Sequence, residues 1–302
     1  MAIKHLLVVG GTGFIGNHLC RVACTRGFKV TSLSLHATKN PLQDVKYLVG
    51  DLTNLEGLKK LFANESFEYV VNCGGYIDHQ SFFNGGRKLI DVHFEGVQNL
   101  IESLPKKNIK RFVNLGSSDE YGALSAPQRE DMRESPISPY SLAKLASTQL
   151  LQMLWNTERY PAVTLRLFLT YGPEQNDQRF LPQIIAGCLN NKTFPVSEGK
   201  QVRDFCYIDD TVNGILQALD TDAANGMVIN IASGDPVKIC DIISMVHSLI
   251  RQGQPEYGKV PYRVGENMAL WANTDLAKTI LNWSPQISLE QGLKNTIAYY
   301  RD

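Results

Sequence analysis

The chain has 302 residues, of which 43% are hydrophobic and 20% are charged, so it suits one large α/β domain or two small ones. Thirty Lys and Arg residues balance thirty Asp and Glu residues, and this neutrality argues against nucleic acid or an anionic membrane as a main partner. The sequence has no apolar run near the roughly 20 residues of a membrane helix and no signal peptide. Its six cysteines include no CxxC pair, so neither a metal site nor a disulfide is expected. We therefore expect a cytoplasmic protein.

The first predicted element is a buried strand at His5–Val9, and the glycine-rich turn after it is the most informative segment of the chain. Glycine lets the backbone bend sharply, approach a pyrophosphate closely and pack a helix tightly on a strand. The helix that follows presents N–H groups and the positive end of its dipole to phosphates. The alternative is a glycine-rich turn without a ligand. We favour a dinucleotide site, whose predicted contacts are Gly10, Thr12, Gly13, Phe14, Ile15 and Gly16.

Strand and helix patterns then alternate along the first half of the chain. Predicted strands cover residues 30–35, 45–49, 69–73, 111–115 and 162–167, and predicted helices cover residues 55–62, 87–104 and 140–155. Apolar strands that alternate with helices predict right-handed crossovers and a doubly wound parallel sheet, the Rossmann arrangement of α/β proteins.

Prolines separate shorter elements from about residue 171 onward. We therefore expect residues 1–170 to form the dinucleotide-binding domain. Residues 171–302 should form mainly a smaller substrate lobe, with residues 204–233 returning to the first domain. Such a lobe would cover the carboxyl edge of the sheet, where ligands bind in doubly wound folds.

A second chemical signal is the pair Tyr140 and Lys144, which share one face of a predicted helix because they lie four residues apart. A lysine ammonium beside a tyrosine favours the phenolate and brings the tyrosine pKa from about 10 toward the working pH. Upstream, the strand at 111–115 runs into Ser117 at the expected ligand edge, where its hydroxyl can hydrogen-bond a substrate oxygen. A solvated helix face and a turn serine are the alternatives, but the three residues in this order favour a catalytic set.

Three later segments carry the motifs RLFLTYGP (166–173), RDFCYIDD (203–210) and NIASG (230–234). With the glycine turn and the Ser–Tyr–Lys set, they resemble the extended short-chain dehydrogenase/reductases, the group of nucleotide-sugar epimerases, dehydratases and 4-ketoreductases. The resemblance covers nearly the whole chain. It implies that the catalytic residues are Ser117, Tyr140 and Lys144. It also implies cofactor contacts at Asp51, Leu52, Gly74, Gly75, Tyr140 and Lys144.

The same resemblance implies a substrate site at the sheet edge. Arg203 and Arg263 would clamp a substrate diphosphate, since the guanidinium fork fits phosphate oxygens, with surface salt bridges as the alternative. His79 lies in the loop after the strand at 69–73, which faces the same edge. The expected substrate contacts are His79, Ser118, Asp119, Thr170, Arg179, Arg203 and Arg263.

Departures from the family pattern bear on the reaction. Leu169 stands where the family has Asn, the glycines at 74–75 replace Ala-Ala, and His93, also at an Asn position, is interpreted as a structural histidine. Family 4,6-dehydratases carry Thr-Asp-Glu. Here Ser118 replaces the Asp, and the acidic pair Asp119 and Glu120 falls one residue later, which argues against a dehydratase. Either carboxylate could still cap a turn or bind a sugar hydroxyl.

The motifs most resemble those of nucleotide-linked 4-keto-6-deoxyhexose reductases of the CDP-abequose synthase type. That resemblance implies hydride delivery to C4, with Tyr140 as general acid, Ser117 on the carbonyl oxygen and Lys144 on the nicotinamide ribose. A nucleotide-sugar 4-epimerase with tightly bound NAD uses the same residues and stays open. A non-catalytic dinucleotide sensor also stays open, although it would have no use for a tuned tyrosine.

The end of the second strand favours NADP over NAD, because no carboxylate stands there to hold the ribose hydroxyls or repel a 2′-phosphate. Ser34 and His36 are the expected contacts, and NAD is the alternative. The helices at 87–104 and 140–155 carry more apolar positions than one sheet face can cover. Resembling family members pair these helices in a four-helix bundle, so we expect a homodimer.

Overall fold

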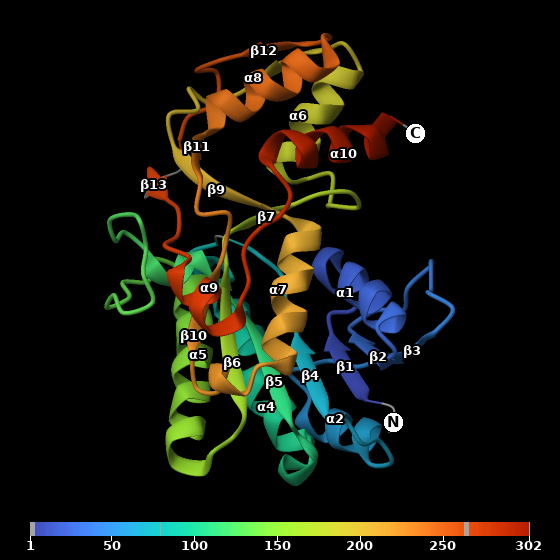
Figure 1. The fold of residues 1–302 in the computed structure, drawn as a ribbon. Helices are drawn as coiled ribbons and strands as arrows, with labels where there is room; N and C mark the ends of the chain where they lie inside the picture. Colours follow the sequence, from blue (N-terminus) through green and yellow to red (C-terminus); the bar gives the residue numbers. More distant parts are fainter. Residues whose placement is uncertain (1–3, 79, 263–265, 302) are drawn as a thin grey trace.

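The computed structural model describes residues 4–78, 80–262 and 266–301, and its centre is a seven-stranded parallel sheet (Figure 1). The strand order is β10-β6-β5-β4-β1-β2-β3. It reverses between β1 and β4, the point where doubly wound sheets open a ligand crevice. The doubly wound α/β fold is therefore confirmed. The strands are β1 (His5–Val9), β2 (Lys29–Ser34), β3 (Val45–Val49), β4 (Tyr69–Asn72), β5 (Arg111–Ser117), β6 (Ala162–Leu167) and β10 (Val228–Ile231).

Helices cover both faces of this sheet, because alternate residues of each strand point to opposite sides. Consecutive residues of β4 belong to two different apolar cores, so both faces are buried. One face is covered by α1 (Phe14–Thr25) and α7 (Ile208–Asp220), and the other by α2 (Leu55–Phe62), α4 (Gly96–Ser103) and α5 (Pro139–Glu158).

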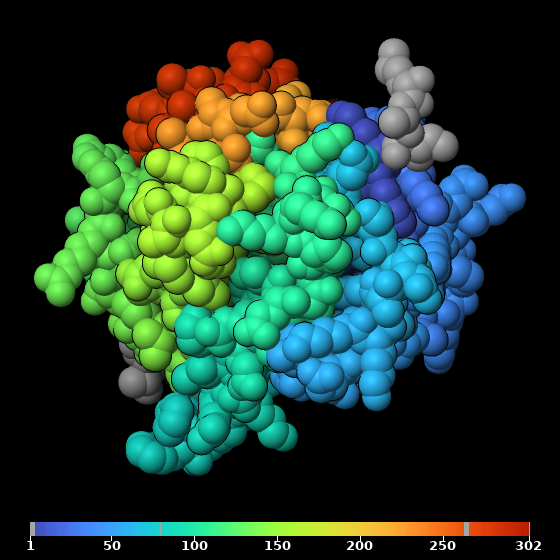
Figure 2. Space-filling model, turned by 90° about the horizontal axis from the view of Figure 1, so that it is seen from below, coloured from blue at the N-terminus to red at the C-terminus, as the bar shows by residue number. Residues whose placement is uncertain are grey.

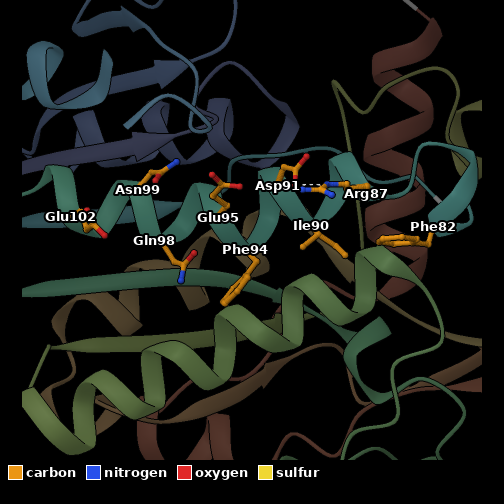
Figure 3. Close-up of a pocket in the computed structure, with 9 residues that line it drawn as sticks. All are labelled: Phe82, Arg87, Ile90, Asp91, Phe94, Glu95, Gln98, Asn99 and Glu102. Carbon is orange, nitrogen blue, oxygen red and sulfur yellow. Dashed lines mark ion pairs between the residues drawn. The ribbon is translucent and has the colours of Figure 1, made fainter. Parts of the chain in front are cut away.

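The helix predicted over residues 87–104 is interrupted. α3 (Arg87–Ile90) passes into a π-helical segment, Asp91–Glu95, before α4 begins. π-Helical turns are frequent at functional sites. Figure 3 shows this continuous rod of α3, the π segment and α4 lying alongside α5.

The remaining elements lie mainly over the carboxyl edge of the sheet, at the top of Figure 1. After β9 the chain returns to the central sheet through α7 and β10, and β10 pairs with β6. How the chain divides into domains stays a prediction. The elements outside the central sheet and its covering helices are β7 (Leu169–Tyr171), α6 (Phe180–Leu189), β8 (Thr193–Pro195), β9 (Val202–Tyr207), β11 (Pro236–Lys238), α8 (Ile239–Ile250), β12 (Gln254–Glu256), β13 (Ala269–Leu270), α9 (Asp275–Leu281) and α10 (Leu289–Arg301). Short 3₁₀ turns lie at Phe82–Asn84, Lys106–Asn108, Ser118–Tyr121 and Asp222–Ala224.

Figure 2 shows the molecule from below, at the end opposite most of these elements. The teal segment that leads into α3 stands out from the body there. Within the described parts of the chain, none of the helices is long and apolar enough to cross a membrane.

Candidate active site

The turn after β1 and the first turn of α1 each contain a position that has room only for glycine. Gly10 has a φ of +73°, in the left-handed region, and a Cβ there would lie 2.8 Å from the Cys73 carbonyl oxygen. A Cβ on Gly16 would overlap the Gly10 carbonyl oxygen. The first turn of α1 has no acidic residue, and no described side chain caps it at Gly13, so its N–H groups suit an anion. The turn therefore fits a dinucleotide pyrophosphate.

The residues predicted to contact the adenosine follow two neighbouring strands. Ser34 is buried at the end of β2, and its Oγ accepts a hydrogen bond from the Thr12 N–H at 3.3 Å. His36 is exposed two residues later. After β3, the Asp51 carboxylate accepts hydrogen bonds from the N–H and Oγ of Thr53 at 2.9 and 2.8 Å. The carboxylate is thereby held in one orientation at the sheet edge.

The glycines after β4 line the next part of this edge. A Cβ on Gly74 would lie 2.9 Å from Val9 Cγ1 and 3.0 Å from Leu52 Cδ1. Gly75 has a φ of +106°, and a Cβ there would overlap the His93 ring. The alanines of the family pattern therefore fit neither position without a shift of the neighbours.

The three predicted catalytic residues come together at the same edge. Ser117 ends β5, and Tyr140 and Lys144 lie in the first two turns of α5. This helix begins where it does because Ser138 accepts a capping hydrogen bond and Pro139 occupies the first helical position. The Ser117 side chain lies close enough to Tyr140 to lower the pKa of its phenol. The Lys144 Nζ lies 5.9 Å from the centre of the Tyr140 ring.

Burial dominates the electrostatics of Tyr140, which is 4% exposed. Burial raises the pKa of this phenol above its usual value, and the nearby Asp119 raises it further. The Ser117 side chain and the Arg179 guanidinium act in the opposite direction. At neutral pH Tyr140 therefore keeps its proton and is available as a general acid. The positive charge of Arg179 stabilises the phenolate that forms when the proton leaves.

Lys144 is buried behind Tyr140, and its Nζ donates a hydrogen bond to the Leu115 carbonyl oxygen at 2.8 Å. Burial lowers the pKa of this ammonium from 10.5 to about 8, although Glu120 and Cys73 pull it upward. A pKa near 8 lets the side chain exchange a proton close to neutral pH.

Glu120 is fully buried as the third residue of the 3₁₀ turn that follows β5, where it completes a capping box with Ser117. Its carboxylate accepts hydrogen bonds from the Ser117 N–H at 2.8 Å and from Thr148 Oγ1 and Arg166 Nε at 2.9 Å. Glu120 thus caps a turn, one of the two roles expected for it, and both its oxygens are taken. The sequence could not predict the pairing of Glu120 with Arg166, because no local pattern pairs residues 46 positions apart.

Several predicted substrate contacts cluster around Tyr140. Ser118 is buried beside Ser117, and the Asp119 N–H donates to Ser117 Oγ at 3.1 Å. Arg179 is exposed at the start of α6, close enough to lower the pKa of Tyr140. An anionic or hydroxylated substrate at this edge would meet these groups first.

Thr170 and Arg203 lie in the smaller sheet and already contact other residues. Thr170 Oγ1 lies 3.2 Å from Thr211 Oγ1. Arg203 pairs with Glu266 and donates to the Val202 carbonyl oxygen at 2.8 Å. A diphosphate would therefore join or replace Glu266 at this guanidinium. Two further predicted contacts, His79 and Arg263, lie outside the described residues.

The later motifs stabilise the junction between the sheet edge and the elements above it. Asp204 is fully buried and accepts hydrogen bonds from the N–H and Oγ of Ser233, both at 2.6 Å. Asn230 accepts a hydrogen bond from the Tyr121 hydroxyl at 2.8 Å and donates to the Gln128 carbonyl oxygen at 3.1 Å. Among the described residues, no group of three or more His, Cys, Asp or Glu side chains could hold a metal ion.

Together, this fold and this site define an NAD-dependent enzyme of the extended short-chain dehydrogenase/reductase class that acts on nucleotide sugars. A family profile described as "NAD dependent epimerase/dehydratase family" matches residues 6–232. The chain therefore belongs to this family.

Similar proteins include both epimerases and dehydratases. The chain is 28% identical to the "Uncharacterized UDP-glucose epimerase YtcB" of Bacillus subtilis, covering 97% of each chain. It is 25% identical to a dTDP-glucose 4,6-dehydratase of Xanthomonas campestris, covering 97% of this chain and 92% of that one. The crystal structure of UDP-glucuronic acid 4-epimerase from Bacillus cereus, in complex with UDP-glucuronic acid and NAD, matches with a TM-score of 0.87, 28% identity and 99% coverage of both chains. These names support the broad family resemblance, and a specific resemblance to CDP-abequose synthase stays a prediction.

Proposed function

We propose that this protein is a 4-epimerase of a nucleotide-linked hexose, which oxidises C4 and then reduces the 4-keto sugar from the other face. The observation that supports this most is the convergence of Ser117, Tyr140 and Lys144 beside a glycine turn that fits a dinucleotide. The carboxylate of Glu120 is held by Arg166 and the turn, which favours redox chemistry at C4 over elimination of water.

In this proposal the catalytic residues handle one proton at the C4 oxygen. The nicotinamide, when bound, supplies the hydride acceptor and donor. Ser117 hydrogen-bonds the C4 oxygen, while Tyr140 takes its proton during oxidation and returns it during reduction. Because burial raises the pKa of Tyr140, its phenolate needs positive charge nearby. Arg179 and the ammonium of Lys144 are the cations that supply it.

The substrate we propose is a uridine diphosphate hexose. UDP-glucose and UDP-glucuronic acid are named for similar epimerases, whereas dTDP-glucose is named for similar dehydratases. Arg179 is exposed at the sheet edge, and Arg203 is a second guanidinium in the smaller sheet. Guanidinium groups fit the oxygens of both phosphates and carboxylates, so these arginines suit either nucleotide sugar.

The test is epimerisation without added cofactor. Purified protein is incubated with UDP-glucose and with UDP-glucuronic acid, and the products are followed by NMR. The 4-epimer should appear, and denaturation should release NAD. Tyr140→Phe protein, purified in the same way, should release NAD but form no epimer. If wild type holds NAD yet epimerises none of a panel of CDP-, dTDP-, GDP- and UDP-hexoses, the proposed function is wrong.

One observation favours a second candidate, an NADPH-dependent reductase of nucleotide-linked 4-keto-6-deoxyhexoses. β2 ends in Ser34 and not in a carboxylate, so its end does not repel a 2′-phosphate. A reductase must exchange its cofactor at every turnover. Loss of the NADPH absorbance on addition of a 4-keto-6-deoxy sugar nucleotide would therefore favour the reductase over the epimerase.

We also propose that the protein is a homodimer through the rod of α3 and α4 and through α5. Leu142 and Met153 on α5 are 49% and 45% exposed, and Phe82, in the 3₁₀ turn before α3, is 47% exposed. A groove of about 520 Å³ runs along the rod, where Ile90 and Phe94 point to the side of α5 (Figure 3). A second copy would cover these apolar groups. Sedimentation that shows only a monomer at micromolar concentration would contradict this assembly.

A further inference from the structure

His93 lies where three elements meet beside the catalytic tyrosine. It belongs to the π-helical segment between α3 and α4 and is 4% exposed. Its ring stands edge-on to the Tyr140 ring, with ring centres 5.0 Å apart and an interplanar angle of 87°. Such edge-to-face pairs have a preferred geometry, so the imidazole fixes where the phenol ring can lie.

The other edge of the imidazole holds the backbone after β4. His93 Nε2 lies 2.7 Å from the Tyr76 carbonyl oxygen. Burial, with the charge of Lys144, lowers the pKa of His93 from 6.5 to about 3, so the ring is neutral at physiological pH. A carbonyl oxygen only accepts, and therefore Nε2 carries the proton and donates it to Tyr76.

Gly75, the residue before Tyr76, leaves room for the imidazole of His93. Gly75 has a φ of +106°, and a Cβ on it would overlap the imidazole. The Gly74 N–H is held in turn by Asn72 Oδ1 at 3.1 Å. Gly74 and Gly75 are predicted to line the cofactor. The backbone from Gly75 to Tyr76 therefore lies against the same imidazole that packs against the Tyr140 ring.

We propose that His93 is a positioning residue that fixes the catalytic tyrosine and the backbone beside the cofactor relative to each other. The inference rests on the proposed function, because it needs a cofactor along Gly75 and a reaction at Tyr140. The hydrogen bond to Tyr76 fixes the backbone, and the ring edge fixes the phenol. The two contacts use different parts of one side chain, so they can be separated by substitution.

Two substitutions each remove one contact. His93→Phe keeps a ring edge against Tyr140 but leaves the Tyr76 carbonyl without its donor. It should weaken NAD binding about tenfold while kcat at saturating cofactor stays within about threefold of wild type. His93→Gln keeps an N–H donor in reach of Tyr76 but removes the ring. It should lower kcat about tenfold or more while the Kd for NAD stays within about threefold.

His247→Phe is the matched control. This histidine of α8 also lies against a carbonyl oxygen, that of Gly253 at 3.1 Å, but in the lobe above the sheet edge. Its replacement should change neither Kd nor kcat. If both variants of His93 lower affinity and kcat together, or neither does, His93 has no separable positioning role and the inference is wrong.

A second measurement keeps the inference testable if no sugar nucleotide is turned over. Ultraviolet titration, taken as the difference from a Tyr140→Phe background, reports the ionisation of Tyr140. His93→Gln admits water to the ring and should lower the Tyr140 pKa that burial raises, whereas His93→Phe should leave it unchanged. The charged and polar groups that face Tyr140 are unchanged in both variants; they are Ser117, Asp119, Glu120, Arg179 and Lys144. An equal titration in both variants would overturn the inference even where the proposed function has failed.

Discussion

The two sides of the carboxyl edge are built by different means. On the side of β1, β2 and α1, the site is made of backbone, and glycines at positions 10 and 16 leave space where a Cβ would collide. On the side of β5 and α5, the site is made of buried ionisable side chains, and burial shifts the pKa of Tyr140 upward and that of Lys144 downward. One side therefore depends on shape and the other on electrostatics, and substitutions should separate binding from chemistry.

The largest effect is expected on the electrostatic side. Tyr140→Phe removes the transferable proton but keeps the ring, so turnover should fall about a thousandfold while the Kd for the cofactor stays within about threefold. Steady-state kinetics and cofactor titration check this. Tyr160→Phe is the control, because Tyr160 is also buried and its hydroxyl has no partner among the described residues. Turnover of the Tyr140 variant near the wild-type rate would show that another group moves the proton.

A steric substitution should break the other side. In Gly16→Ala, the new Cβ collides with the Gly10 carbonyl oxygen, which cannot move without distorting the turn. Strain of about 2–3 kcal/mol should weaken cofactor binding about 30- to 100-fold, as measured by titration. Gly27→Ala is the control. Gly27 has a positive φ, +81°, so alanine strains its backbone, but a Cβ there would meet nothing within 4 Å. Equal losses of affinity in the two variants would mean that the turn has no special shape requirement.

On the electrostatic side, the buried ammonium of Lys144 should lower the free energy of unfolding. Its folded pKa of about 8 lies below the usual 10.5, so below pH 8 the fold must hold an ammonium that burial disfavours. Between pH 8 and 10.5 the folded protein has lost a proton that the unfolded chain keeps, so wild-type stability rises with pH there. Lys144→Met should therefore stabilise the fold by about 2 kcal/mol at pH 7, and the gain should shrink above pH 8.

Denaturant unfolding at several pH values measures this gain. Lys294→Met is the control, because Lys294 is half exposed in α10 and pairs only with Glu290 among the described residues. Its replacement should change stability by less than about 0.5 kcal/mol with no trend in pH. A Lys144 variant that is less stable than wild type at pH 7 would show that the hydrogen bond to Leu115 outweighs the cost of burial.

The sequence could predict the features that depend on local signals. Strand β1 and helix α2 lie at the predicted residues, because apolar periodicity and flanking glycine or asparagine are local signals. Ser117, Tyr140 and Lys144 could be predicted to meet, because parallel strands bring their carboxyl ends to one edge. The π-helical segment Asp91–Glu95 within the predicted helix at 87–104 could not be predicted, since nothing in the apolar periodicity marks it.

Partners distant in sequence could not be predicted from local patterns. Arg203 was expected to clamp a diphosphate, and only the folded chain shows Glu266, 63 residues later, against its guanidinium. The carboxylate of Glu120 likewise accepts a hydrogen bond from Arg166 in the neighbouring strand β6. Both pairs depend on tertiary packing, which brings together charges from elements that are far apart in the sequence.

The smallest expected effect concerns which cofactor the shape-based side admits. Ser34 Oγ accepts a hydrogen bond from the Thr12 N–H at the end of β2, where a carboxylate would hold the ribose hydroxyls of NAD and repel a 2′-phosphate. Ser34→Asp should therefore lower the affinity for NADPH relative to NADH about tenfold. Separate titrations of the two cofactors measure that ratio. Thr38→Asp adds the same charge four residues away, so it shows how much of the change in this ratio comes from added negative charge alone and not from its position at the end of β2. A ratio that is the same in wild type and Ser34→Asp would mean that the end of β2 does not contact the ribose.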